Sequence, residues 1–342
     1  WCMTRAWYGV VPTGAQAGFA IDSLVSRFAE ECPEAVVPLD KCRYVDDIAA
    51  GAATKEEREE QIRQSTLVLA KGGFNFKFIV RSGEKPSETA SSDGETLKML
   101  GYKWNPYIDT FSPGLGELNF NRKKRGLKNP NLFPVETRED ATELLRTVII
   151  TRKLVVAKVA EFYDPVGLFE PIKLQMKLDL SGLNNTDWEE PLKVPEQERW
   201  KERFLNYIDY PTMQARRSVL ELTHGNKPIR LIGISDAAAH AGGAVIYAGT
   251  EQEDGTYSCN MLVSKSRLMK GTIPRNELSA LMLLTELAFI AKRAIGDRVQ
   301  EIIYLTDSTI TLAWCQSSGR RLRLFVNNRV ETVKRLIEWT LD

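Results

Sequence analysis

The chain has 342 residues, of which 43% are hydrophobic and 27% are charged. This composition is that of ordinary globular proteins and excludes a disordered chain or a fibrous repeat, while the length predicts two or three domains. Because 46 basic residues are balanced by 45 acidic ones, any nucleic-acid binding must come from local patches and not from the net charge of +1.

The cysteine distribution, the apolar runs and the first residue indicate the environment of the chain and whether it begins at a natural start. The five cysteines are scattered, which disfavours a disulfide framework and indicates a reducing, intracellular environment. No run approaches the roughly 18 consecutive apolar residues of a membrane span, so we expect no membrane partner. Trp1 precedes a segment that resembles the interior of a domain, and we interpret this end as an internal cut.

The first hundred residues are predicted to hold one clear helix and one aromatic strand. The helix opens at Thr54, with Glu57 at the spacing of a capping box, and ends near Gly72. Aromatic and apolar residues alternate with polar ones over residues 74–80, which predicts a strand, and a polar loop follows over residues 82–95.

Two adjacent acids, Asp46 and Asp47, interrupt the apolar run of residues 43–48. Paired carboxylates at a tight turn can hold divalent metal, and polymerases use two such ions to align a primer hydroxyl with a nucleoside triphosphate. The alternative is an ordinary solvated turn.

The middle of the chain, residues 106–225, contains nine of the 15 prolines and is predicted to form helices joined by long connections. Its best helix is predicted over residues 152–162. Thr151 is the expected N-cap, and Asp164-Pro165 lies beyond the end of the helix.

From about residue 226 the pattern changes to strand, strand, strand, helix, strand, helix. The β-rich runs are residues 229–234, 243–247, 260–263 and 302–306. The first helix begins near Pro274, and Glu277 lies on the same stripe as its apolar residues. We therefore expect the Glu277 carboxylate to face the sheet.

Three acids of this last region are predicted to meet at one edge of the sheet. Asp236 and Asp307 each end a β-rich run, and Glu277 opens the helix between them, 41 residues after the first and 30 before the second. Such a cluster can bind two Mg²⁺ ions that activate water and stabilise the leaving oxygen in phosphodiester hydrolysis. The alternative is three unrelated acids.

Basic residues cluster at two places where they could contact nucleic-acid phosphates. The alternative is solvated surface charge. The predicted nucleic-acid-binding residues are Arg122, Lys123, Lys124, Arg125, Arg320, Arg321 and Arg323.

The first region resembles the palm of reverse transcriptases. Its Tyr44-Val45-Asp46-Asp47 is similar to the Tyr-x-Asp-Asp hairpin of that family. Residues 8–14 resemble the family's glycine-rich element, which implies a following helix to about Glu31, and residues 100–104 resemble the segment that closes the palm. The family's first catalytic aspartate would precede this chain, so we expect no DNA synthesis by the chain alone.

The last region resembles ribonuclease H, because the order is strand-Asp, helix-Glu, strand-Asp, whereas integrases and transposases have the glutamate last. Nearly the whole chain resembles the Pao/BEL group of long-terminal-repeat retrotransposons. The segments that carry this resemblance are residues 162–168, 188–192, 235–237, 264–267, 273–278, 306–308 and 325–330. A fourth acid of this group would lie beyond Asp342, so we expect weak or absent turnover by this chain.

The resemblance implies a partial reverse-transcriptase palm over residues 1–105, a thumb and connection region over 106–225, and a C-terminally truncated ribonuclease H-like domain over 226–342. The implied fold class is an α+β palm remnant, a mostly helical connection and an α/β ribonuclease H-like domain with a mixed sheet. The implied function is that of a retrotransposon reverse transcriptase/ribonuclease H fragment that uses Mg²⁺, with Mn²⁺ as a substitute. Its implied partners are an RNA/DNA hybrid or primer-template and the rest of the polyprotein, in cytoplasmic particles.

Two alternatives stay open. One is an inactive or domesticated remnant that serves as a binding module for nucleic acid or protein. The other is an aspartic peptidase, because this region of Pao elements is sometimes catalogued under that name. Such a peptidase presents its catalytic dyad on Asp-Thr-Gly or Asp-Ser-Gly turns, which the sequence lacks, so we expect no proteolysis.

Overall fold

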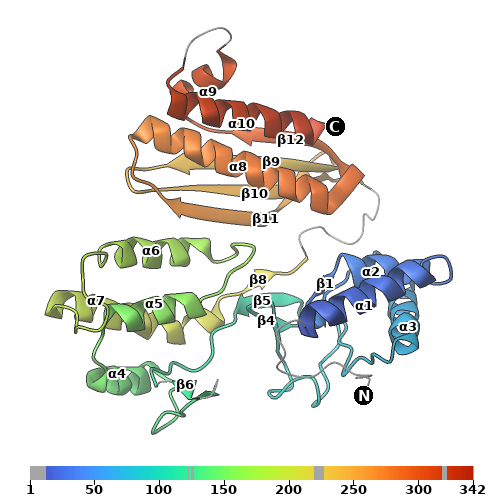
Figure 1. Ribbon diagram of the computed structural model, residues 1–342, viewed down its shortest axis with the longest axis horizontal. Coiled ribbons are helices and arrows are strands. Elements are labelled where there is room, and N and C mark those ends of the chain that lie inside the picture. The colour runs from blue at the N-terminus through green and yellow to red at the C-terminus, as the bar shows by residue number, and fades with distance from the viewer. Residues whose placement is uncertain (1–12, 122, 125–126, 219–226, 318–321, 342) are drawn as a thin grey trace, which may run out of the picture. The chain divides into compact units, whose positions relative to one another are not determined.

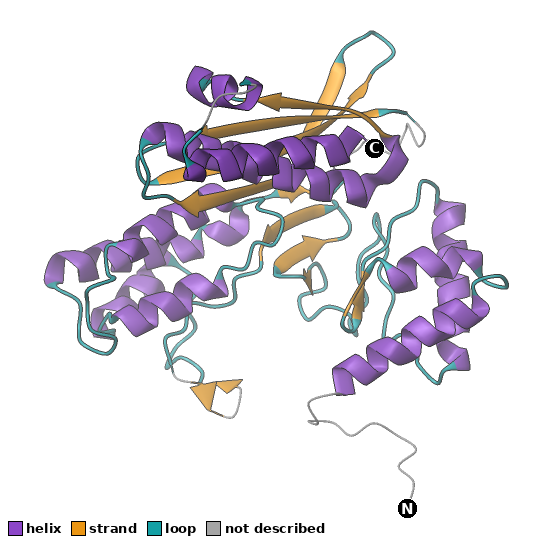
Figure 2. Ribbon diagram, turned by 45° about the horizontal axis from the view of Figure 1, so that its top comes forward, coloured by secondary structure: helices purple, strands orange, loops and turns teal. Residues whose placement is uncertain are grey.

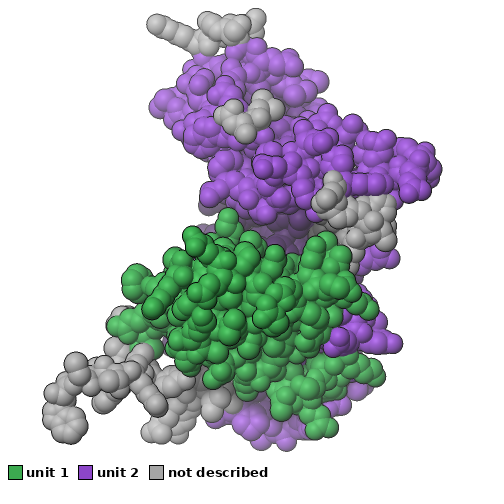
Figure 3. Space-filling model, turned by 90° about the vertical axis from the view of Figure 1, so that its right-hand side faces the viewer, with its two compact units in different colours: residues 1–81, 85–94 green, residues 82–84, 95–342 purple. Residues whose placement is uncertain are grey.

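The computed structural model describes residues 13–121, 123–124, 127–218, 227–317 and 322–341. Two compact units make up the chain, one of residues 1–81 and 85–94 and the other of residues 82–84 and 95–342 (Figure 3). The domain limits predicted after residues 105 and 225 stay predictions. No helix within the described residues is long and apolar enough to cross a membrane.

The first unit is built mainly from three α-helices (Figure 1), namely α1 (Thr13–Phe28), α2 (Val36–Asp40) and α3 (Lys55–Lys71). The predicted helix to about Glu31 is confirmed as α1, while residues 8–12 of the glycine-rich element lie outside the described residues. The predicted capping box of α3 is confirmed, because Thr54 and Glu57 each accept a hydrogen bond from the other's backbone N–H. The buried core consists of Ile21, Val25, Cys32, Ala35, Leu39, Val68 and Leu69.

The strand predicted over residues 74–80 is wrong. These residues form an irregular segment with no strand partner. Phe74 and Phe76 pack against the core of the first unit, whereas Phe78 is exposed. Alternation predicts a strand only if a neighbouring strand satisfies the backbone hydrogen bonds, and here burial of two aromatic rings explains the pattern instead.

The second unit begins with a small antiparallel sheet. Its strands are ordered β3 (Leu97–Met99), β4 (Tyr102–Asn105), β5 (Thr110–Pro113) and β8 (Ala215–Arg216). The tight turn between β3 and β4 contains Gly101 at a φ of 91°, a conformation that glycine adopts at little cost. A separate two-stranded hairpin consists of β6 (Lys123–Lys124) and β7 (Leu127–Lys128).

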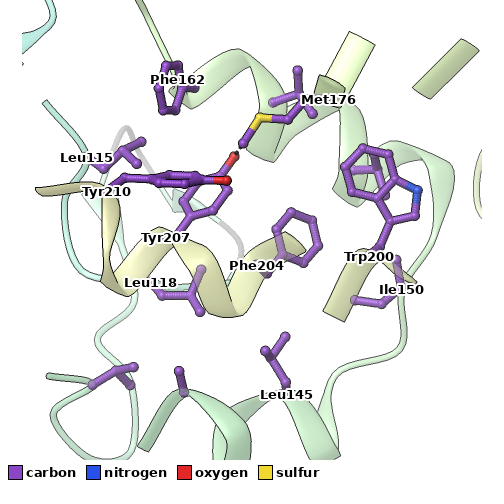
Figure 4. Close-up of a cluster of buried hydrophobic side chains, with 14 of the residues drawn as sticks. Leu115, Leu118, Leu145, Ile150, Phe162, Met176, Trp200, Phe204, Tyr207 and Tyr210 are labelled. Carbon is purple, nitrogen blue, oxygen red and sulfur yellow. Dashed lines mark hydrogen bonds between the residues drawn. The ribbon is translucent and has the colours of Figure 1, made fainter. Parts of the chain in front are cut away.

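A helical layer follows this sheet, composed of α4 (Arg138–Thr147), α5 (Arg152–Glu161), α6 (Glu170–Ser181) and α7 (Val194–Leu205). The helix predicted over residues 152–162 is confirmed as α5, and the Thr151 hydroxyl caps it by accepting from the Leu154 N–H at 3.2 Å. Figure 4 shows part of the buried core of this unit, including Phe162, Met176, Trp200, Phe204, Tyr207 and Tyr210. Within the described residues, the short 3₁₀ helices are η1 (Pro33–Ala35), η2 (Asn206–Ile208), η3 (Tyr210–Thr212) and η5 (Gly296–Arg298).

The last part of the second unit contains a mixed four-stranded sheet. Its strands are β9 (Ile229–Ala237), β10 (Ala241–Glu251), β11 (Tyr257–Leu268) and β12 (Val299–Leu305). The order across the sheet is β11-β10-β9-β12, with β9, β10 and β11 antiparallel and β12 parallel to β9. All four predicted strands are confirmed.

Two long helices run along this sheet (Figures 1 and 2), α8 (Ile273–Ile295) and α10 (Leu324–Leu341), and a shorter α9 (Thr309–Gln316) lies between them in the chain. α8 packs against β9 and β10 through buried leucines and alanines, as its predicted apolar stripe requires. The helices and the mixed sheet confirm the predicted fold class.

The helical layer is joined to the edge strand β11 by the segment around Asp164, a buried residue. Its carboxylate accepts hydrogen bonds from the Tyr102 hydroxyl and from the backbone N–H groups of Leu168 and Phe169, at 2.9 and 2.8 Å for the latter two. These contacts fix the loop that precedes α6.

Two further contacts attach that loop to the sheet. The Ser264 N–H donates to the carbonyl oxygen of Val166 at 2.9 Å, and the Ser264 hydroxyl donates to the carbonyl oxygen of Gly167 at 2.5 Å. The buried Glu170 carboxylate accepts from the Ser266 N–H and hydroxyl at 3.1 and 2.6 Å and is paired with Lys177 at 2.6 Å. Hydrogen bonds from Ser264 and Ser266 therefore hold the helical layer against the sheet.

Candidate functional site

The candidate site lies where β9 and β12 end. The two strands run parallel, and Leu305 is the register partner of Ile234. Asp236, still in β9, and Asp307, just beyond β12, each lie two residues further along the chain. Both side chains are exposed, so both predicted acids lie at the same end of the sheet.

Glu277 reaches the same region from the second turn of α8, which begins at Ile273. Its half-buried carboxylate accepts a hydrogen bond from the hydroxyl of Ser308, the residue that follows Asp307. Its neighbour Asn276 is buried and donates to the carbonyl oxygens of Ala238 and Ala239, at 2.9 and 3.2 Å. The start of α8 is therefore tied to both strand ends that present an aspartate.

The strand order and the start of α8 bring the three residues to the same end of the sheet, but their carboxylate groups do not converge on one point. In the described part of the chain, no three acidic, histidine or cysteine side chains are close enough to hold one metal ion together. Among the described residues, the Asp236 carboxylate accepts a hydrogen bond only from the backbone of its neighbour, the Ala237 N–H at 2.7 Å. None of the three carboxylates forms an ion pair with a lysine or arginine that the structure describes.

Ser308 was not predicted as a functional residue. Its hydroxyl is buried, donates to Glu277 and accepts from the backbone N–H of Thr311 at 3.2 Å, so it also caps α9. Its position directly after Asp307 and before a helical run is a signal for a cap, although sequence alone cannot reveal the partner on α8.

The second predicted pair of acids lies in the first unit. β1 (Arg43–Tyr44) and β2 (Asp47–Ile48) form a hairpin in which Tyr44 pairs with Asp47, and Val45 in its turn has a φ of 57°. Asp46 and Asp47 are exposed. Partial desolvation and then the negative charge of Asp46 raise the pKa of Asp47.

The predicted basic residues are only partly described. Arg122, Arg125, Arg320 and Arg321 lie outside the described residues. Lys123 and Lys124 are in strand β6, and Arg323 is exposed just before α10. Their role in nucleic-acid binding stays a prediction.

A family model described as a Pao retrotransposon-like RNaseH-like domain matches residues 151–308. The match extends from the cap of α5 to Ser308 and includes all three acids of the candidate site. No curated protein sequence matches the chain.

Two solved structures illustrate the likeness in three dimensions. A foamy viral protease-reverse transcriptase in complex with double-stranded DNA is 14% identical, with 98% of this chain and 49% of that chain covered and a TM-score of 0.49. RNase H1 from the archaeon Halobacterium salinarum is 15% identical, with 32% and 78% covered and a TM-score of 0.23. The chain spans about half the length of the viral protein. Because both TM-scores are low, the fold assignment rests on the strand order and the family match.

Proposed function

We propose that residues 151–308, which match the model of a Pao retrotransposon-like RNaseH-like domain, form such a domain, and that Asp236, Glu277 and Asp307 act in it to hydrolyse the RNA strand of an RNA/DNA hybrid. The observation that carries the proposal is the parallel pairing of β9 with β12, which places Asp236 and Asp307 at the same end of adjacent strands. The Ser308 hydrogen bond directs Glu277 toward that end.

The donor set suits a divalent cation. Carboxylate oxygens are the ligands that Mg²⁺ prefers, and Mn²⁺ accepts the same ligands. The acids are bound to neutral donors only, Asp236 to a backbone N–H and Glu277 to a hydroxyl. Because no lysine or arginine among the described residues neutralises them, their negative charge is available to a cation.

The roles of the residues follow from their positions. Bound divalent metal ions would activate a water molecule and stabilise the leaving oxygen of the phosphodiester. Asp236 supplies a carboxylate from β9, Asp307 supplies one from the segment just after β12, and Glu277 supplies one from α8. Ser308 holds the direction of Glu277, and Asn276 keeps the start of α8 against the turn after β9.

The test is cleavage of a labelled RNA/DNA hybrid with Mg²⁺ or Mn²⁺ by the purified chain. We expect Asp236→Asn and Asp307→Asn each to reduce cleavage by at least about 100-fold, because each removes a charged metal ligand. Asp297→Asn is the matched control, since this exposed acid lies in η5 beyond the other end of α8. Cleavage by wild type that survives both substitutions would refute the assignment.

A second candidate function is binding of nucleic acid without hydrolysis, as in a remnant of a retrotransposon enzyme. The observation that favours it is that the three carboxylates are not within reach of a common ion. Hybrid binding by wild type, with no metal-dependent cleavage in either cation, would support this candidate over hydrolysis.

For the first unit, we infer that the hairpin around Val45 is the palm hairpin of the reverse transcriptase and that Asp46 and Asp47 hold divalent metal in the parent polyprotein. The pairing of Tyr44 with Asp47 across a two-residue turn supports this inference. Its test is primer extension on an RNA template by the parent polyprotein, which Asp46→Asn and Asp47→Asn should each abolish.

A further inference from the structure

The ring of Phe325, at the start of α10, contacts two arginine side chains. The guanidinium carbon of Arg329 lies 3.6 Å from the ring centroid, and that of Arg275 lies 5.1 Å from it. A cation over an aromatic face is attracted by the ring's electron density and loses some of its freedom to move. Both guanidinium groups therefore contact the same aromatic ring.

This pair lies at the same end of the fold as the candidate site. α8 and α10 run in the same direction, since Arg329 contacts Ser279 early in both helices and Trp339 contacts Phe289 late in both. Arg275 is in the first turn of α8, two residues before Glu277. The aligned peptide dipoles of two long helices add positive potential at this end.

Neither guanidinium is neutralised by a carboxylate among the residues that the structure describes. Arg329 donates only to neutral acceptors, the Ser279 hydroxyl at 3.1 Å and the Phe325 carbonyl oxygen at 3.3 Å. Other arginines of the same part of the fold do have an acidic partner: Arg230 pairs with Glu301 and Arg267 with Glu286, at 2.8 and 2.9 Å.

Two arginines that contact one ring and have no carboxylate partner carry an electrostatic cost unless an anion binds to them. Arg329 is half-buried, and this partial burial lowers its pKa by disfavouring the charged form. Two like charges on one ring also repel each other. A phosphate group would relieve both effects, because the guanidinium fork matches two phosphate oxygens.

We propose that Arg275 and Arg329, held by Phe325, bind a backbone phosphate of the nucleic-acid strand that reaches the acids at the ends of β9 and β12. The identity of the ligand rests on the proposed function. The exposed Arg323 directly precedes α10, two residues before Phe325.

The test measures the affinity of the chain for a short fluorescent RNA/DNA hybrid. Fluorescence anisotropy is the readout, in the presence of EDTA and at a series of salt concentrations. Arg275→Gln should weaken binding about 3- to 10-fold and reduce the slope of log K against log salt by about 0.9, the loss of one phosphate contact. Arg329→Lys should weaken binding less, because it keeps the charge and loses only the planar fork.

Arg335→Gln is the matched control. Arg335 lies 5.1 Å from the ring centroid of Trp339, the same distance as Arg275 from Phe325, but at the far end of α10. Its substitution removes an identical charge and should leave both affinity and slope unchanged. Equal effects of Arg275→Gln and Arg335→Gln, or no effect of Arg275→Gln, would overturn the proposal.

EDTA separates this inference from the proposed function, because binding is measured without metal. Arginine-dependent binding with no metal-dependent cleavage would overturn only the hydrolytic assignment. Metal-dependent cleavage together with binding that is insensitive to Arg275→Gln would overturn only the arginine site, and absence of any hybrid binding by wild type would overturn it as well.

Discussion

The buried hydroxyl of Ser308 donates a hydrogen bond to the carboxylate of Glu277, joining the segment after β12 to the second turn of α8. The same oxygen accepts from the backbone N–H of Thr311 at 3.2 Å and so caps α9. One small side chain therefore links the cap of one helix to the orientation of an acid on another.

Ser308→Ala is expected to lower the free energy of unfolding by about 1–2 kcal/mol, because it removes a helix cap and a hydrogen bond to a carboxylate. Urea unfolding measures this loss. Ser308→Thr retains the hydroxyl and should lose less. The control is Ser317→Ala at the other end of α9, where the hydroxyl donates only to the Trp314 carbonyl oxygen; a loss there as large as in Ser308→Ala would contradict the explanation.

Gly167→Ala is expected to disrupt the contact between the loop that precedes α6 and strand β11. Gly167 has a φ of 76°, and a Cβ atom there would lie 2.0 Å from the Ser264 carbonyl oxygen. Because this clash adds to the backbone strain, we expect a loss of more than about 2 kcal/mol in urea unfolding.

Gly255→Ala is the control that separates the steric clash with Ser264 from the backbone strain of a positive φ. Gly255 has a similar φ of 80°, but no atom lies within 4 Å of its added Cβ. Only the left-handed conformation is then penalised, at about 1–2 kcal/mol. Equal losses in the two variants would show that the contact with Ser264 contributes nothing.

Tyr102→Phe is expected to destabilise the second unit by about 2–3 kcal/mol. The substitution removes a hydrogen bond to the buried Asp164 carboxylate. It also removes the Tyr102 oxygen that accepts from the Val166 N–H at 3.2 Å in the wild-type chain. Burial and then the hydrogen bond to Asp164 raise the pKa of Tyr102, so the folded hydroxyl keeps its proton. The loss should be constant from about pH 7 to pH 9, below the point at which an unfolded tyrosine ionises.

The comparison variant for Tyr102→Phe is Tyr257→Phe. Tyr257 is exposed and its hydroxyl donates to Glu251 at 2.8 Å, so solvent replaces the lost bond and the cost should stay below about 1 kcal/mol. Thermal or urea unfolding that ranks the two variants in the opposite order would argue against a structural role for Asp164.

Asp109 should contribute to stability in a pH-dependent manner. Its carboxylate accepts from Arg217 at 2.6 and 2.8 Å and from the Trp104 indole N–H at 3.0 Å. Burial alone would raise the pKa of Asp109, but the hydrogen bonds from Arg217 and Trp104 outweigh it and the pKa is lowered.

A carboxyl group whose pKa is lower in the folded chain stabilises the fold fully above its unfolded pKa of about 3.9, and this contribution is lost as pH falls through the folded value. The difference in unfolding free energy between wild type and Asp109→Asn should therefore be largest, on the order of 1 kcal/mol, near pH 6–7 and shrink below pH 4. A difference that grows on acidification would reverse the assigned sign.

Local patterns predicted several elements correctly. The capping box at Thr54, the cap at Thr151 and the β-rich runs of the last region all depend on neighbours within a few residues. Residues 74–80 show the limit of such patterns, because their alternation reflects burial of Phe74 and Phe76 and not strand pairing. The pairing of β5 with β8 also had no local signal, since the two strands are far apart in the chain.

By itself the sequence determined the order of the acids, their placement at strand and helix ends, and the resemblance that the family match over residues 151–308 supports. Only the tertiary structure decided which side chains meet: Ser308 with Glu277, Gly167 with Ser264, and two arginines on the ring of Phe325. The physical reason is that helix caps and strand periodicity arise from interactions along the chain, whereas these contacts depend on packing between segments that are distant in sequence.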